Sequence, residues 1–223
     1  MTLALTICGL LLLAAYLLGS IPTGYTAGKL LKGVDIREVG SGSTGATNVL
    51  RTLGKGPALA VLLIDMLKGV GAIALIHSFY TFQPSLLPPA WEPWLVAVAG
   101  FAGVLGHSRS IWLNFTGGKS VATSLGVLLA MAWQVGLGTL GVFGIMLAVS
   151  RIVSLSSITG AIAVNVLMIV LKQPLPYQIF AAVAGIFVIW RHRSNIQRLL
   201  AGTEPQLGQK VTSEAESGSQ LPS

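Results

Sequence analysis

The sequence predicts an all-α integral membrane protein with seven transmembrane helices, and three features of its composition lead to this fold class. Charged residues make up 9% of the chain and hydrophobic residues 53%, whereas a soluble domain carries roughly 25% charged residues. The mean hydropathy is +0.77. Glycine accounts for 27 of the 223 residues, as expected where helices pack closely in lipid through small residues.

Apolar runs define the expected helices in order. They cover residues 3–24, 57–79, 94–111, 118–133, 135–150, 153–171 and 177–190. The stretch 118–150 is divided because a single helix of that length would rise roughly 50 Å, against a hydrocarbon core of about 30 Å. Two short helices with a turn near 134–138 fit the bilayer better. The first run has no basic segment before it and no convincing cleavage site after it, so we expect a retained span.

Lysines and arginines set the expected orientation of these spans. If the N-terminus lies outside and the C-terminus in the cytoplasm, only Lys172 of the 14 basic residues falls on the outer side. Basic loops favour the cytoplasmic side of a membrane, which supports this orientation. Residues 1–202 then form one transmembrane domain. Residues 203–223, rich in Ser, Gln, Glu and Gly, are expected to be a disordered cytoplasmic tail.

Two glycine-rich polar strings interrupt the apolar pattern, at residues 39–48 (VGSGSTGATN) and 115–123 (FTGGKSVAT). The first contains the letters of a dinucleotide-binding fingerprint, but no strand or βαβ unit surrounds it. The second resembles the end of a P-loop, but Leu113 stands where that motif requires glycine. In both strings, glycine lets backbone N–H groups approach an anion, and a nearby cation completes the cradle. We therefore expect an anion site; the alternative is two flexible loops without a ligand.

The polar segments 35–51, 107–123, 151–157 and 191–195 all fall on the cytoplasmic side of the predicted topology. One site assembled from all four at the membrane surface is the economical interpretation. The net charge of +7 does not indicate nucleic acid, because the basic residues are spread between hydrophobic segments. Topology and contacts with membrane lipid explain them better.

Several ionisable residues allow more than one interpretation. Asp35 is expected to pair with an arginine and hold the first string, and the alternative for Asp35 and Glu38 is simple solvation of the loop. Asp65 and Lys68 lie three residues apart near the inner end of the second span, and form either a functional pair or an ion pair that neutralises itself. His107 and His192 can each donate to a phosphate or carbonyl, or act as a general base.

The residue inventory excludes several classes of enzyme. Only Asp35, Glu38 and Asp65 are acidic on the inner side before the tail, too scattered for a magnesium-dependent phosphotransferase, and Cys8 is the single cysteine. We expect no metal site. No His-x4-Asp motif of the familiar glycerolipid acyltransferases occurs, and no Gly-x-Ser-x-Gly elbow of a serine hydrolase. What remains is a metal-free reaction of an already activated substrate.

Longer motifs run through the chain to about Gly208. They are GSIPTG at 19–24, GVDIREVGSGSTGATN at 33–48 with Arg51, DMLKG at 65–69, GH at 106–107, FTGGKSVAT at 115–123, VSLSS at 153–157 and RHRSNIQRLL at 191–200. In length, order and spacing they resemble the bacterial acyl-phosphate:glycerol-3-phosphate acyltransferases, the PlsY-type family. The chain departs from the family pattern at Ser43, Ser110, Thr116, Ser120 and Ser194. Thr116 removes one positive charge, because the family usually has lysine there.

The resemblance implies a long-chain acyl phosphate as donor, sn-glycerol 3-phosphate as acceptor and 1-acylglycerol 3-phosphate (lysophosphatidic acid) as product. It implies no cofactor, and a site at the cytoplasmic face of the bacterial inner membrane. The catalytic residues that it implies are Ser41, Lys119, His192 and Asn195. The substrate-binding residues that it implies are Gly40, Gly42, Gly45, Ala46, Thr47, Asn48, Arg51, His107, Gly117, Gly118, Lys119, Ser154 and Ser156.

Within that set, the resemblance divides the two substrates. Ser41 and the backbone of residues 42–48 should meet the phosphate of the donor, while Arg51, Lys119, His192 and Asn195 should hold the acceptor phosphate and the reacting groups. The alternative from another class is a transporter of organic phosphates, which would use the same anion cradle for passage. Symmetry-related halves with discontinuous spans would indicate a transporter, and the sequence has none. A lipid-binding scaffold is a weaker third possibility.

Overall fold

The computed structural model describes residues 1–209 of the chain, and in these residues the fold is all-helical. The helices are α1 (Thr2–Ser20), α2 (Thr23–Lys32), α3 (Ala46–Leu53), α4 (Lys55–Phe82), α5 (Glu92–Ser108), α6 (Val121–Met131), α7 (Trp133–Ser150), α8 (Val153–Val170), α9 (Leu175–Arg191) and α10 (Arg193–Leu200). Single turns of 3-10 helix lie at Pro89–Trp91 and Ile111–Leu113.

Each expected apolar run overlaps one helix along most of its length, in the order α1, α4, α5, α6, α7, α8 and α9. The stretch Thr2–Lys32, which holds α1 and α2, is long and apolar enough to cross a membrane, as are α4, α7 and α8, and α6 and α9 are shorter apolar helices. The all-α membrane class is therefore confirmed. The number of seven spans and the positions of the two termini stay predictions.

Several helix boundaries differ from those expected from the apolar pattern, and two of the differences have a clear local cause. The first run ends four residues early, because Pro22 has no N–H and cannot continue a helix, so α1 stops at Ser20 and α2 starts at Thr23. The break in the 118–150 stretch falls at Ala132, before the expected turn at 134–138. Gly136 explains the shift, because it packs directly against Leu129 and lets α6 and α7 turn closely back on each other.

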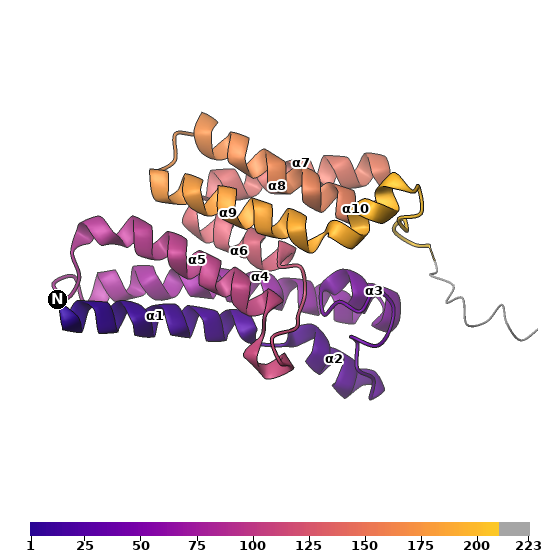
Figure 1. Cartoon of the computed structure of the whole chain (residues 1–223), viewed down its shortest axis with the longest axis horizontal. Helices are drawn as coiled ribbons and strands as arrows, with labels where there is room; N and C mark the ends of the chain where they lie inside the picture. The colour runs from indigo at the N-terminus through magenta and orange to yellow at the C-terminus, as the bar shows by residue number, and fades with distance from the viewer. Residues whose placement is uncertain (210–223) are drawn as a thin grey trace, which may run out of the picture.

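Helices pack in two groups, which meet where α6 packs on α7 and where α5 packs on α9 (Figure 1). Helix α1 packs on α5 and α4 packs on α6, while α7, α8 and α9 lie together on the other side. Glycine makes the α4–α6 contact possible: a Cβ on Gly69 would overlap the Thr123 carbonyl, and one on Gly126 would overlap the Met66 carbonyl. Small residues at such crossings let helix backbones approach, as they do in lipid.

Apolar side chains occur both inside the bundle and on its surface. Ile73, Val96 and Val127 are fully buried in the main core. Ile186 is 70% exposed and Val149 80% exposed, on helices with almost no charge. A soluble protein rarely leaves such a large apolar surface uncovered, so lipid is the medium that these side chains fit.

The short polar helices gather at the end of the bundle opposite the N-terminus (Figure 1). There α2, α3 and α10 lie near the loops that carry the two glycine-rich strings. A small second core of Ile36, Val49, Ala58 and Val61 fixes α3 and the first string against the start of α4. Of the segment expected to be a tail, residues 203–209 are described and Leu207 N–H donates to the Arg151 carbonyl, 2.7 Å away. Residues 210–223 lie outside the described part of the chain.

Candidate active site

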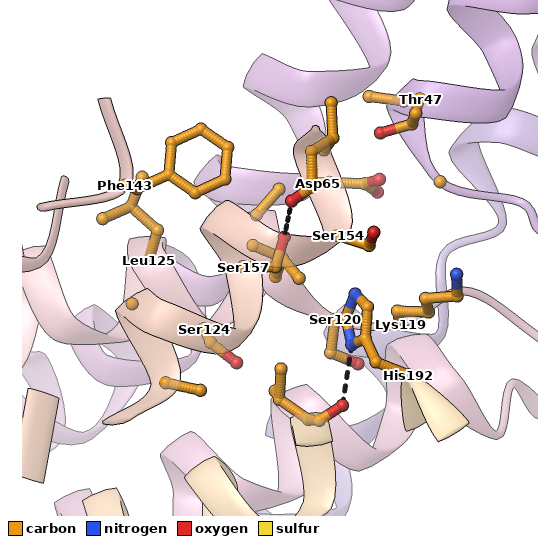
Figure 2. Close-up of a pocket in the computed structure, with 18 of the residues that line it drawn as sticks. Thr47, Asp65, Lys119, Ser120, Ser124, Leu125, Phe143, Ser154, Ser157 and His192 are labelled. Atoms are coloured by element: carbon orange, nitrogen blue, oxygen red, sulfur yellow. Dashed lines mark hydrogen bonds between the residues drawn. The ribbon is translucent and has the colours of Figure 1, made fainter. Parts of the chain in front are cut away.

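A cavity of about 410 Å³ opens at the end of the bundle that holds the short helices. Its polar part is lined by the first glycine string, by Lys119, by His192 between α9 and α10, and by Asn195 of α10. Its apolar part continues between α4, α6, α7, α8 and α9, past Leu125 and Phe143. Figure 2 shows Lys119, His192 and Ser154 at the polar part, with Leu125 and Phe143 on the other side. Such a cavity suits a ligand with an anionic head and an apolar chain.

Asn48 organises the first glycine string. Its side-chain amide donates to the carbonyls of Ile36, Val39 and Ser43 at 2.9–3.0 Å, and its Oδ1 accepts the Ser41 N–H at 2.8 Å. Gly40 has a positive φ and lies so close to Asn48 that a Cβ would overlap the amide. The string is therefore a folded cradle held by a buried side chain, which favours an anion site over a flexible loop.

Replacing Asn48 with alanine is expected to lower the stability of the solubilised protein by about 2–3 kcal/mol, because four buried backbone groups lose their partner. Thermal inactivation in detergent measures the effect. Asn165→Ala is the matched control, since the Asn165 amide donates to one carbonyl within its own helix. Equal inactivation temperatures for the two variants would contradict the organising role of Asn48.

The second glycine string is fixed by Arg191 and by His107. Arg191 Nη2 donates to the carbonyls of Gly117 and Gly118 at 3.0 and 2.9 Å. Gly118 N–H donates to the His107 carbonyl at 3.2 Å, and a Cβ on Gly118 would overlap the His107 ring. Glycine is therefore required at 118, and the string places Lys119 at the cavity.

Two of the serines that depart from the family pattern form buried hydrogen bonds around this loop. Ser110 Oγ donates to the Ser20 carbonyl at 2.6 Å, and Ser120 Oγ donates to the Val104 carbonyl at 2.7 Å. Thr116 accepts from Arg37 Nη1 at 3.2 Å. These side chains thus hold the loop where the family pattern has other residues.

Lys119 begins a chain of polar contacts across the mouth of the cavity. Its Nζ donates to Asn195 Oδ1 at 2.5 Å, and Asn195 Nδ2 donates to Glu204 Oε1 at 2.5 Å. Ser154 Oγ donates to the same carboxylate oxygen at 2.7 Å, and Arg198 pairs with Glu204 Oε2 at 2.7 Å. Three segments far apart in sequence, around Lys119, around Ser154 and at residues 195–204, thereby meet at one place.

Glu204 is a site residue that sequence reasoning missed, because it lies in the segment expected to be a tail. Its side chain is only 4% exposed and lines the cavity. Burial opposes its ionisation, but hydrogen bonds from Asn195, Ser154 and Arg198 outweigh burial and lower the pKa of the carboxyl. One feature of the sequence could have indicated Glu204: the resemblance to the family runs to about Gly208 and so includes this residue.

Burial also lowers the pKa values of Lys119 and His192, two basic groups that line the cavity with Asn195. It lowers the pKa of Lys119 to about 8, although the negative charge of Glu204 acts in the opposite direction and raises this pKa. It lowers the pKa of His192 to about 4, so the imidazole is neutral at pH 7. His192 Nδ1 lies 2.7 Å from the Val188 carbonyl and must be the protonated nitrogen there. Nε2 is therefore a hydrogen-bond acceptor.

A buried ion cluster supports the cavity from the α4 side. Asp65 lies 2.9 Å from Lys68 Nζ and 3.5 Å from His107 Nδ1, and it accepts a hydrogen bond from Thr23. Lys68 also donates to the Ile21 carbonyl at 3.0 Å. The cluster joins the α1–α2 link to α4 and α5, so the pair does more than neutralise itself: it fixes three segments around the cavity.

The structure brings most of the expected site residues together. Those that line the cavity are Ser41, Gly45, Ala46, Thr47, Asn48, Arg51, His107, Lys119, Ser154, His192 and Asn195. Those that do not line it are Gly40, Gly42, Gly117, Gly118 and Ser156. The glycines shape the two strings from behind, and Ser156 donates within its own helix to the Ile152 carbonyl at 2.9 Å, while its neighbour Ser157 lines the cavity.

Fold and cavity together define an integral membrane protein with a site for an anionic, lipid-like ligand. The sequence profile of the glycerol-3-phosphate acyltransferases matches residues 9–202. The glycerol-3-phosphate acyltransferase of Trichormus variabilis is 65% identical over 97% of this chain and 99% of its own. That of Nostoc sp. is 65% identical over 95% of this chain and 97% of its own. The chain therefore belongs to the glycerol-3-phosphate acyltransferase family.

Two solved structures are similar to the whole bundle. Both are crystal structures of PlsY (YgiH), an integral membrane glycerol 3-phosphate acyltransferase, and both are 41% identical to this chain. The glycerol 3-phosphate form has a TM-score of 0.80 and covers 90% of this chain and 96% of its own. The lysophosphatidic acid form has a TM-score of 0.77, and the match covers 90% of this chain and 95% of the PlsY chain. The expected PlsY-type family is confirmed.

Proposed function

We propose that this protein transfers a long-chain acyl group from an acyl phosphate to sn-glycerol 3-phosphate, giving 1-acylglycerol 3-phosphate and phosphate. This proposal rests on one cavity that joins a cationic polar part to an apolar part between the helices. The relatives named for this activity, and the PlsY structures with glycerol 3-phosphate and lysophosphatidic acid, support the same reaction.

The proposed setting is the bacterial inner membrane, crossed by α1, α4, α5, α6, α7, α8 and α9. The N-terminus lies outside and the C-terminus in the cytoplasm. The helices α3 and α10, which carry Arg51 and Arg198, lie at one end of the bundle, whereas the link from α8 to α9, which carries Lys172, lies at the other (Figure 1). The concentration of basic residues at the cavity end supports a cytoplasmic site, where glycerol 3-phosphate is available from water and the acyl donor from lipid.

The donor phosphate fits the first glycine string. Ser41 and the first residues of α3, Ala46 and Thr47, line the cavity. The first turn of a helix leaves N–H groups without carbonyl partners, and these groups attract anions. The acyl chain then extends from this cradle into the apolar part of the cavity, past Leu125 and Phe143.

The acceptor phosphate fits the cations Lys119 and Arg51, with Asn195 beside them. His192 takes a different role, because its neutral Nε2 accepts a hydrogen bond and suits the glycerol hydroxyl better than a phosphate. That hydroxyl attacks the acyl carbonyl directly. A carbon–oxygen bond forms, the acyl–phosphate bond breaks, and the leaving phosphate takes the proton of the hydroxyl.

Each part of this arrangement lowers the barrier in a known way. Holding both substrates in one cavity contributes about 7–11 kcal/mol through positioning. Lys119 and the backbone amides stabilise the charge that develops on the leaving phosphate, at about 3–4 kcal/mol for a well-placed donor. The phosphate of a mixed anhydride leaves readily, so no acyl-enzyme is required.

Glycerol 3-phosphate binding is expected to take up close to one proton near pH 9. The Lys119 pKa of about 8 leaves the free amine mostly neutral at that pH, and a bound phosphate dianion raises the pKa of the ammonium by favouring its charged form. Below about pH 7, Lys119 is protonated in both states and the uptake disappears. Calorimetry in buffers of different ionisation enthalpy measures it. In Lys119→Arg the guanidinium stays charged throughout, so uptake that persists in this variant would contradict the assignment.

Product formation by the purified protein tests the function. Palmitoyl phosphate and labelled glycerol 3-phosphate are supplied in neutral lipid, with acyl-CoA and acyl-carrier-protein thioesters as parallel donors. Lysophosphatidic acid from the acyl phosphate alone is the expected result. Product from a thioester only would overturn the donor assignment. Uptake of glycerol 3-phosphate into liposomes without any product would favour a transporter instead.

A further inference from the structure

A second hollow of about 440 Å³ lies next to the two glycine strings, apart from the cavity. Ser41 and Ser43 line the cavity, while Gly42 between them lines the second hollow. Gly117 lines the hollow as well, whereas Lys119 lines the cavity. The strings therefore form a wall with one space on each side, and the proposed acyl transfer uses only one of these spaces.

Three arginines line this hollow, and one of them is already neutralised. Arg37 Nη2 lies 2.6 Å from Asp35 Oδ2, and Arg37 Nε is shared between both carboxylate oxygens. The hydrogen bond from Arg37 lowers the pKa of Asp35 to about 2, so the pair stays ionised at pH 7. Arg37 also donates to Thr116 at 3.2 Å. This pair forms a rigid edge of the hollow and confirms the structural role expected for Asp35.

Arg109 and Arg191 are not neutralised. Within residues 1–209, neither has a carboxylate at ion-pair distance, although Glu38 also lines the hollow. Arg109 Nη1 donates to the Phe115 carbonyl at 3.2 Å, and Arg191 Nη2 donates to two carbonyls of the second string. Arg191 Nε is buried without a hydrogen-bond partner among the described residues. Two positively charged guanidinium groups thus line one hollow, and each has N–H donors that are not used in the described hydrogen bonds.

We propose that this hollow is a second anion site, in which Arg109 and Arg191 bind a phosphate group. A tetrahedral oxyanion presents several acceptor oxygens at once, which matches the fork of donors on each guanidinium and relieves the repulsion between the two charges. The hollow lies at the end of the bundle assigned to the cytoplasmic surface. Its ligand is therefore either the phosphate of an anionic lipid headgroup or a free phosphate.

The lipid source is tested with the full chain in nanodiscs of phosphatidylcholine that contain increasing phosphatidylglycerol. Native mass spectrometry counts the phosphatidylglycerol molecules that the protein retains. We expect saturable retention that Arg109→Gln weakens about fivefold, the effect of one basic residue on an anionic lipid. Arg193→Gln is the matched control and should leave retention unchanged, because Arg193 stacks on Trp190 at 5.0 Å and does not line the hollow.

The free source is tested with inorganic phosphate in phosphatidylcholine nanodiscs, by calorimetry on the Lys119→Ala variant, in which the first site is disabled. We expect one saturable site that disappears on adding Arg109→Gln and survives adding Arg193→Gln. Acyl transfer by Arg109→Gln in neutral nanodiscs reports that it folds, and Arg109→Lys, which keeps the charge, should retain binding. The expected result in either experiment supports the site, and the experiment that gives it shows whether the ligand is a lipid headgroup or free phosphate. Equal binding by Arg109→Gln and Arg193→Gln in both arms overturns it.

Discussion

Replacing Lys119 with alanine should lower turnover by roughly 10²–10³-fold, the cost of one preorganised donor at a developing charge. Lys119 is the cation placed at the cavity by the second glycine string, and it contacts Asn195 at 2.5 Å. Initial rates of lysophosphatidic acid formation with palmitoyl phosphate measure the loss. Because the side chain lies at the cavity mouth and not in the core, thermal inactivation should stay close to that of the unchanged protein.

Two further lysine variants sharpen this prediction. Lys172→Ala removes a lysine at the far end of the bundle and should leave turnover unchanged. Lys119→Arg keeps the positive charge but replaces a compact ammonium with a planar fork, so an intermediate rate is expected. Turnover of Lys119→Ala within a few-fold of the unchanged protein would contradict its assignment to the reacting groups.

Replacing Asp65 with alanine should have the largest effect on stability, about 3–5 kcal/mol, because it leaves Lys68 buried without its counter-charge. The Lys68 side chain is 4% exposed and lies 2.9 Å from Asp65. Thermal inactivation of the detergent-solubilised protein measures the loss, and the yield of folded protein should fall with it.

The double variant Asp65→Leu with Lys68→Met is the matched test of this cause. It removes both charges and keeps similar side-chain volume, so it should recover most of the stability that Asp65→Ala loses. Activity should recover less, because His107 and Thr23 also lose a partner. A double variant as unstable as the single one would mean that packing, and not an unpaired charge, causes the loss.

The fold was predictable where apolar residues cluster into runs long enough for a bilayer helix, and so each run overlaps one apolar helix. Ends of helices were less predictable, because they depend on contacts between helices. The close approach of Gly136 to Leu129 moves the α6–α7 turn to Ala132. The short helices α3 and α10 are amphipathic and polar, so a search for apolar runs does not find them.

The site was predictable where local sequence signals its chemistry. Glycines with a following lysine or asparagine indicate an anion cradle, and Lys119 and Asn48 do lie at one cavity. Glu204 was not predictable in this way, since a single carboxylate in a polar tail has no local pattern and gains its role only from Asn195 and Ser154. The contact of Asp65 with His107 depends on how α4 and α5 pack, and sequence spacing does not reveal it.

Direct transfer between two substrates held in one cavity requires that phosphate leave only when the acceptor is bound, and phosphate release in a single turnover measures this. The protein is loaded with palmitoyl phosphate and mixed rapidly with or without glycerol 3-phosphate. We predict that phosphate appears only when glycerol 3-phosphate is present, in an amount equal to the lysophosphatidic acid formed, and that Ser41→Ala slows both together. A burst of phosphate without acceptor, with the acyl group retained on the protein, would contradict direct transfer and assign an acyl-enzyme instead.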